Sequence, residues 1–167
     1  MTGRIRTELL SDRHDRQGFS CGVAALDRYL KTQAGPDMRR RVSNCFVATD
    51  EATGAILGFY TLAAASIPMT DLPAAEAKKL PRYPTLPAVL LGRLAIDRHW
   101  QGRKLGGVLL YDAARRAALA DPAAFALLVD AKDEAAAAFY RHHGFQPFAN
   151  HPGSLFLALA AIARLLG

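Results

Sequence analysis

Tryptophan and cysteine are the scarcest residues of this 167-residue chain, which contains one tryptophan and two cysteines. Two cysteines, Cys21 and Cys45, cannot form a framework of several disulfides, and their spacing is not that of a metal site. Reduced cysteines are typical of proteins in a reducing compartment. We therefore predict a cytoplasmic location.

The chain also lacks the ligand spacing of a metal site and the long apolar run of a membrane span. His142 and His143 are adjacent, so their side chains would point in different directions on a helix. The other histidines have no paired ligand spacing; they are His14, His99 and His151. The N-terminal segment is too polar for a signal peptide, and no apolar run reaches the length needed to cross a bilayer. We expect neither a metal nor a membrane partner.

Motifs for nucleophilic catalysis and for nucleotide binding are missing as well. No serine or cysteine stands in a hydrolase or cysteine-nucleophile motif. The glycine-rich stretch lacks the Gly-Lys-Ser/Thr ending of a nucleotide P-loop, and it lacks the glycine spacing of a Rossmann fold. The sequence therefore shows no motif for a covalent Ser or Cys enzyme intermediate.

The length and composition fit one globular domain over residues 1–167, with 51% hydrophobic residues and 22% charged residues. A chain of this length can bury a sizeable core. The formal net charge is +6, which favours polyanionic partners such as nucleic acid or phosphate-bearing ligands. The same charge can serve solubility alone, and the composition leaves both interpretations open.

Strand-like and helix-like segments alternate along the chain, which predicts an α/β (α+β) fold. The predicted strands are Arg4–Leu10 with Ile5 and Leu9 inward, Cys45–Thr49, Ala55–Ala65, Val89–Ile96, Phe125–Ala131, Phe145–Phe148 and Ser154–Leu159. The predicted helices are one capped by Ser20 and ending before Gly35, Thr70–Leu80, one beginning at Leu105, Ala135–His142 between Asp133 and Gly144, and Ala160–Leu166. Prolines 81, 84 and 87 predict a loop.

The most informative stretch is Gly92–Asp112, which runs from a short apolar strand through a basic glycine loop into an amphipathic helix. The free N–H groups at a helix start carry a partial positive charge and bind anions. Glycines allow a phosphate to approach the backbone closely, and Arg103 and Lys104 add full charges. The stretch predicts an anion site, although a plain strand-to-helix connection would look similar.

Two motifs in this chain resemble those of the GNAT family of N-acetyltransferases. The first is Gln101–Gly106, which matches the family loop Gln/Arg-x-x-Gly-x-Gly/Ala except that Lys104 replaces the first glycine. The second is Ala138–Phe145. The resemblance covers most of the chain and implies a mixed central sheet flanked by helices, with acetyl-CoA as the acetyl donor.

The resemblance also implies site residues. The loop would hold the acetyl-CoA pyrophosphate, and the strand before it would hold the pantetheine arm; these positions are Leu94, Ala95, Ile96, Gln101, Gly102, Arg103, Lys104, Leu105, Gly106 and Gly107. Tyr140 matches the general acid that protonates the departing thiolate, since a phenol keeps its proton at neutral pH. Alternatively, Tyr140 only packs the helix end with Phe139 and Phe145.

The sequence marks no general base, and Glu134 is only the carboxylate nearest to Tyr140 along the chain. An α-amine has a reference pKa of about 7.7–8.0, whereas a lysine has one of about 10.4. The α-amine therefore needs less help to lose its proton. This favours an α-amine acceptor.

A narrower resemblance is to the acetyltransferase toxins of bacterial toxin–antitoxin pairs. It rests on Phe19–Gly22 followed by Leu26, Tyr29 and Leu30, on Gly92–Asp97 and on Phe139–Phe145. It implies acetylation of the α-amine of aminoacyl-tRNA, a block of translation, a ribbon-helix-helix antitoxin and a homodimer. The alternatives are an acetyltransferase for a small amine or a protein N-terminus, and a CoA-binding module without catalysis.

Basic residues outside the loop are candidates for binding the tRNA backbone. They are Arg39, Arg40, Arg41, Lys78, Lys79 and Arg93. For Arg39–Arg41 the alternative is a solvated face of a loop or helix. For Arg93 the alternative is a structural pairing just inside the central strand.

Overall fold

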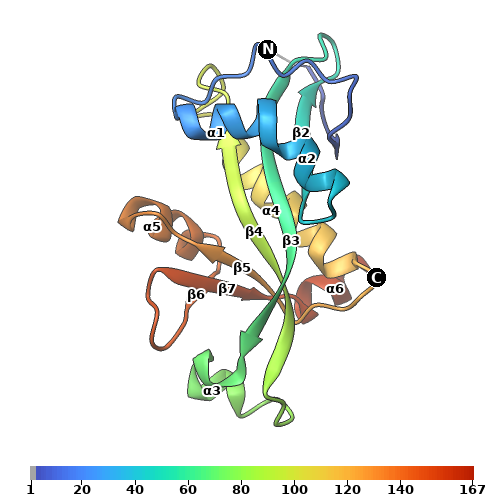
Figure 1. Ribbon diagram of the computed structural model, residues 1–167. Helices are drawn as coiled ribbons and strands as arrows, with labels where there is room; N and C mark the ends of the chain where they lie inside the picture. The colour runs from blue at the N-terminus through green and yellow to red at the C-terminus, as the bar shows by residue number, and fades with distance from the viewer. Residues whose placement is uncertain (1–2) are drawn as a thin grey trace. The chain divides into compact units, whose positions relative to one another are not determined.

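The computed structural model describes residues 3–167, and its strands form one seven-stranded sheet in the order β1-β2-β3-β4-β5-β7-β6 (Figure 1). The strands are β1 (Ile5–Leu9), β2 (Asn44–Asp50), β3 (Ile56–Pro68), β4 (Thr85–Ile96), β5 (Ala126–Asp130), β6 (Gln146–Pro147) and β7 (Ser154–Ala158). Strands β4 and β5 run parallel, whereas β1–β2, β2–β3, β5–β7 and β6–β7 are antiparallel pairs. The predicted mixed α/β fold is confirmed.

The helical segments alternate with these strands. They are α1 (Ala24–Arg28), the π-helical turn η1 (Tyr29–Gln33), α2 (Ala34–Arg39), the 3₁₀ turn η2 (Met69–Asp71), α3 (Ala74–Ala77), α4 (Leu105–Leu119), α5 (Glu134–His142) and α6 (Ala160–Leu166). No helix among the described residues is both long enough and apolar enough to span a membrane.

Internal contacts divide the chain into two compact units, which are described one at a time. The first unit contains the residues up to Ala63 together with Gly92–Ala113. Its core packs the π-helical turn η1 against the sheet, with the ring of Phe59 5.5 Å from that of Phe19 and 6.4 Å from that of Tyr29. These apolar side chains come from segments far apart in the sequence.

The second unit contains Ala64–Leu91 and Ala114–Gly167. Its core includes Phe148 and Phe156, whose rings stack at 4.9 Å, together with apolar residues from β3, β4 and β5. Helix α5 lies beside β7 in this unit (Figure 1). The unit thus carries α5, which holds Tyr140.

The first helical region differs from its prediction at both ends. Helix α1 begins at Ala24 after Val23, and Ser20 provides no cap; its backbone N–H donates instead to Asp97 Oδ2 (3.2 Å). The helical region continues as α2 through Gly35 and Pro36 and ends at Arg39. The wider π-helical turn η1 precedes this proline, and Pro36 stands in the first turn of α2, where its missing N–H costs little.

Three further predictions about local structure are wrong. The expected helix Thr70–Leu80 is reduced to η2 and the single turn α3, because Pro73 forces Leu72 into an extended conformation with ψ 145°. Strand β4 already begins at Thr85, inside the expected proline loop. On β1, Ile5 and Leu9 do not point inward and are 38% and 47% exposed.

Candidate active site

The basic glycine loop between β4 and α4 is held in place by Gln101. The side-chain Nε2 of Gln101 donates to the carbonyl oxygens of Cys21 (2.8 Å) and Ile96 (2.9 Å). One amide therefore ties the loop to the end of β4 and to the segment before α1. Both N–H donors of Gln101 are used in this way, so we assign Gln101 a positioning role in the loop.

Lys104 adopts the backbone conformation that a glycine would adopt at its place in the motif. Its φ is +65°, in the left-handed region, and Gly102 in the same loop has φ +80°. A side chain in this region is strained by roughly 1–2 kcal/mol because Cβ approaches the carbonyl oxygen. The loop of this chain therefore keeps a glycine-like shape while carrying an additional positive charge.

This strain leads to a stability prediction. We expect Lys104→Gly to be more stable than Lys104→Ala by about 1 kcal/mol, because both lose the charge but only glycine accepts this φ without strain. Urea unfolding midpoints of the two variants measure the difference. Equal midpoints would show that the strain at position 104 is absent in solution.

The start of α4 is suited to binding an anion. Helix α4 is 15 residues long and has no acidic residue in its first turn, where Gly106 and Gly107 are partly exposed. Next to it, the Arg103 guanidinium lies 4.9 Å from the Trp100 ring centroid, which holds this charge beside the loop. Helix N–H groups, glycines and basic side chains together favour a phosphate group here.

We expect Gly106→Asp to weaken the binding of acetyl-CoA by at least tenfold. The added carboxylate would repel the phosphates, whereas an acidic residue in the first turn of a helix is favourable for the fold. The control is Gly106→Asn, which has nearly the same shape without the charge. Calorimetric titration measures both affinities, and an unchanged affinity in the aspartate variant would remove the phosphate site from this loop.

The end of β4 presents the backbone that the resemblance assigns to the pantetheine arm. Ala95 is buried, whereas the side chains of Leu94 and Ile96 are half-buried. The carbonyl oxygen of Ile96 is occupied by Gln101, and Asp97 N–H donates to Leu57 at 2.8 Å. The roles of these three residues in binding acetyl-CoA stay predictions.

Tyr140 lies on α5 in the second unit. Asp133 caps this helix by accepting from the N–H of Ala136 (2.8 Å), and Gly144 ends it with φ +95°, as predicted. The Tyr140 ring packs 5.5 Å from that of Phe145, and burial raises the pKa of its hydroxyl above the ordinary value. Such a phenol keeps its proton at neutral pH, as a general acid requires.

Glu134 and the two cysteines have structural surroundings that do not indicate a catalytic role. Glu134 on α5 forms an ion pair with Arg141, which occupies this carboxylate. Burial raises the pKa of Cys45 to about 12 and also raises that of Cys21. Neither thiol is a thiolate at neutral pH, and this agrees with direct transfer to the acceptor. Residues 3–167 contain no cluster of three or more His, Cys, Asp or Glu side chains able to hold a metal.

The basic candidates for RNA binding fall into both units. In the first unit, Arg39, Arg40 and Arg41 are exposed at the end of α2. The Arg93 guanidinium lies 3.7 Å from the Tyr29 ring centroid, and Tyr29 in turn donates to Asp37 Oδ2 (2.8 Å). This stacking favours the structural alternative for Arg93.

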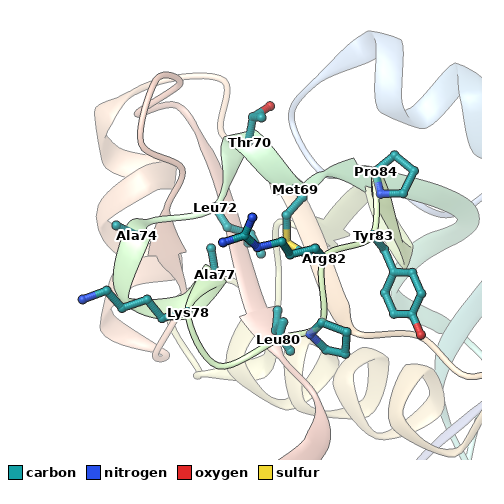
Figure 2. Close-up of a pocket in the computed structure, with 11 residues that line it drawn as sticks. Met69, Thr70, Leu72, Ala74, Ala77, Lys78, Leu80, Arg82, Tyr83 and Pro84 are labelled. Carbon is teal, nitrogen blue, oxygen red and sulfur yellow. The ribbon is translucent and has the colours of Figure 1, made fainter.

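The other two candidates belong to the second unit, near a pocket of about 750 Å³ that is lined by the segment connecting β3 to β4 (Figure 2). Lys78 lines this pocket, whereas Lys79 pairs with Glu76 at 3.6 Å. Figure 2 also shows Arg82 and Tyr83 on the wall. No sequence pattern singles out these two residues, because they stand in a proline-rich loop without periodicity.

Comparison with known proteins agrees with these motifs. The Acetyltransferase (GNAT) domain family matches residues 41–147. A "tRNA-acetylating toxin" of Mycobacterium tuberculosis is 37% identical, over 100% of this chain and 99% of its own length. A "Probable toxin TacT" of Sinorhizobium fredii is 30% identical, over 98% of this chain and 96% of its own length.

Three solved structures of the AtaT toxin are also similar. AtaT complexed with acetyl-methionyl-tRNAfMet has a TM-score of 0.86 and 32% identity, covering 98% of this chain and 100% of the other. AtaTR bound with AcCoA has a TM-score of 0.79 and 32% identity, covering 98% of each. An AtaT tyrosine-to-phenylalanine mutant bound to the C-terminus of its antitoxin AtaR has a TM-score of 0.77 and 30% identity, covering 96% and 97%.

The family match covers more than half of the chain, and the matches to the two toxins extend over nearly all of it. These matches include the glycine loop, the capped helix α5 and Tyr140. This chain belongs to the GNAT family of acetyltransferases.

Proposed function

We propose that this protein is an acetyl-CoA-dependent N-acetyltransferase that acetylates the α-amine of aminoacyl-tRNA and thereby acts as a translation-blocking toxin. One observation carries the proposal: the chain is similar over nearly its full length to a toxin named for tRNA acetylation and to a toxin solved in complex with acetyl-methionyl-tRNAfMet. Two features of the structure support it: the loop before α4, with left-handed backbone at Gly102 and Lys104, and the buried phenol of Tyr140.

The reaction transfers the acetyl group in one step. The amine lone pair attacks the thioester carbonyl, so that a C–N bond forms and the C–S bond breaks. Tyr140 donates its proton to the departing sulfur, the amine releases its proton to solvent, and the Tyr140 phenolate then regains a proton from solvent. The loop from Gln101 to Gly107 and the backbone of Leu94–Ile96 would hold acetyl-CoA in position, as proposed from the resemblance. An amine that is largely neutral at working pH needs no strong base.

The direct test is acetylation of a pool of charged tRNA. The enzyme and acetyl-CoA are incubated with aminoacylated tRNA, and the released aminoacyl groups are analysed by mass spectrometry. We expect an added acetyl group on the α-amine of one or more amino acids. Transfer to polyamines or free amino acids, without transfer to any charged tRNA at low salt, would contradict the proposal.

The exposed arginines at the end of α2 are proposed to contact the tRNA backbone. Each phosphate contact contributes roughly −0.7 to −0.9 to the slope of log affinity against log salt. Replacing Arg39–Arg41 by alanine should flatten this slope and raise KM for tRNA, while the affinity for acetyl-CoA stays unchanged. Steady-state kinetics over a potassium chloride series measures the effect. An unchanged slope would assign these arginines to a merely solvated surface.

We further propose that residues 1–167 act as one cytoplasmic GNAT domain, form a homodimer and bind a ribbon-helix-helix antitoxin. The similar AtaT structure with the C-terminus of AtaR supports an antitoxin partner. Light scattering of the purified protein measures its oligomeric state. Co-purification with the product of a neighbouring gene encoding a ribbon-helix-helix protein tests the partner. A monomer without such a neighbouring gene would contradict both proposals.

A further inference from the structure

Two arginines that are distant in the sequence converge above Gly35 on helix α2. A β-carbon placed on Gly35 would lie 3.3 Å from the Nη1 atom of Arg39 and 3.6 Å from the Nη1 atom of Arg16. Arg39 is one helical turn away on α2, whereas Arg16 belongs to the segment between β1 and α1. The fold therefore brings two positive guanidinium groups to one point of the first unit.

These two charges have little opposite charge close to them. Arg16 Nη1 donates to the carbonyl oxygen of Leu30 (3.3 Å), which carries no net charge. The carboxylate of Asp12 lies 3.9 Å from Arg16 Nη2 and is fully exposed, so this ion pair contributes little. Among residues 3–167, no salt bridge involves Arg39.

The Arg16 side chain is largely removed from solvent. Its side chain is only 18% exposed, so much of its hydration is lost. A guanidinium has five N–H donors in a planar fork, and those of Arg16 are mostly unused by the described residues. Burying a charged group without adequate partners is costly. An anion above Gly35 would offset both the desolvation and the repulsion from Arg39.

We infer that Arg16 and Arg39 form a phosphate-binding site that holds one phosphodiester of the substrate's RNA backbone. The inference rests on the proposed function, which supplies an RNA substrate. A phosphate oxygen pair matches the fork of a guanidinium, and one phosphate can accept from both arginines at the same time. Gly35 leaves the space between them open, because any larger side chain would occupy it.

The experiment measures binding of uncharged tRNA by fluorescence anisotropy over a potassium chloride series. The variants are Arg16→Gln, Arg39→Gln and the double variant. The matched control is Arg28→Gln, which removes an exposed arginine of α1. Thermal unfolding verifies that each variant is folded. Arg39 is exposed, so its variant remains informative even if the loss of the mostly buried Arg16 destabilises the protein.

A shared phosphate predicts non-additive effects. Each single variant should reduce the salt slope by roughly 0.7–0.9, the contribution of one phosphate, and the double variant should reduce it no further. The control should leave the slope unchanged. Additive losses in the double variant would mean two independent contacts and would overturn the shared site, and so would slopes equal to wild type.

Two further measurements identify the source of the phosphate. Calorimetry with acetyl-CoA should give the same affinity for Arg39→Gln and wild type, whereas titration with inorganic phosphate should give a lower affinity for the variant. A loss of acetyl-CoA affinity instead would assign the site to the coenzyme's phosphates and overturn the RNA assignment. Acetylation of charged tRNA by the wild type, with unchanged tRNA binding in both variants, would reject this site and leave the proposed function standing.

Discussion

Replacing Tyr140 by phenylalanine is expected to lower turnover by about 10²–10⁴-fold, the usual contribution of a general acid. The substitution removes only the hydroxyl group, so the ring contacts with Phe139 and Phe145 remain and the fold should be kept. Affinity for acetyl-CoA should be nearly unchanged. Single-turnover kinetics measures the chemical step, and calorimetry measures the affinity.

The matched control is Tyr111→Phe, which removes a phenol from the exposed face of α4, where Tyr111 is 60% exposed. This control should retain wild-type turnover. If Tyr140→Phe also retained full turnover under conditions where chemistry limits the rate, Tyr140 would be a packing residue only. In that case the thermal stability of Tyr140→Phe would also equal that of the wild type.

The pH dependence offers an independent check on Tyr140. Burial raises the pKa of its hydroxyl, so the protonated form that donates is present below the ordinary tyrosine pKa of about 10 and is lost only above it. We expect no decline in the turnover of the wild type from pH 7 to pH 9 that arises from this group. A decline in this range that disappears in Tyr140→Phe would contradict the raised pKa.

Replacing Gly58 by alanine is expected to destabilise the first unit by about 1–3 kcal/mol, as for other overpacked sites. The new β-carbon would lie 2.9 Å from the carbonyl oxygen of Ala95 and 2.9 Å from Cδ1 of Leu109. The first of these is a backbone atom, so the strand β4 itself must move. Because Ala95 belongs to the proposed pantetheine strand, affinity for acetyl-CoA should fall as well.

The control for this substitution is Gly18→Ala. A β-carbon on Gly18 has no heavy atom within 4 Å, and the residue has no positive φ. Alanine there should leave stability unchanged or raise it by about 0.4–1 kcal/mol through the unfolded chain. Urea unfolding compares the two variants. Equal stabilities would show that β4 yields to the added methyl group without cost.

Much of the fold follows from local sequence patterns. Helix α5 shows this clearly: Asp133 caps it, Gly144 ends it, and its residues 134–142 match the predicted range closely. The strand, basic glycine loop and helix of Gly92–Asp112 were also predictable. Caps, glycine stops and apolar periodicity act over a few residues, so they can be read directly from neighbouring positions.

Prolines were less predictable, because their effect depends on where a helix begins. Pro36 lies within helix after the π-helical turn η1, whereas Pro73 reduces an expected helix of eleven positions to the short turn α3. The same residue type is tolerated in a first turn and disruptive further along. A helix propensity averaged over several residues does not say where a proline stands relative to the start of the helix.

The sequence by itself therefore determined the acetyltransferase family, the mixed fold, the basic glycine loop and the helix that carries Tyr140. The tertiary structure decided that Lys104 takes a left-handed backbone, that Gln101 ties the loop to Cys21, and that Arg16 meets Arg39. The reason is distance along the chain. Contacts between residues far apart in the sequence depend on how whole segments pack, and no local pattern records that packing.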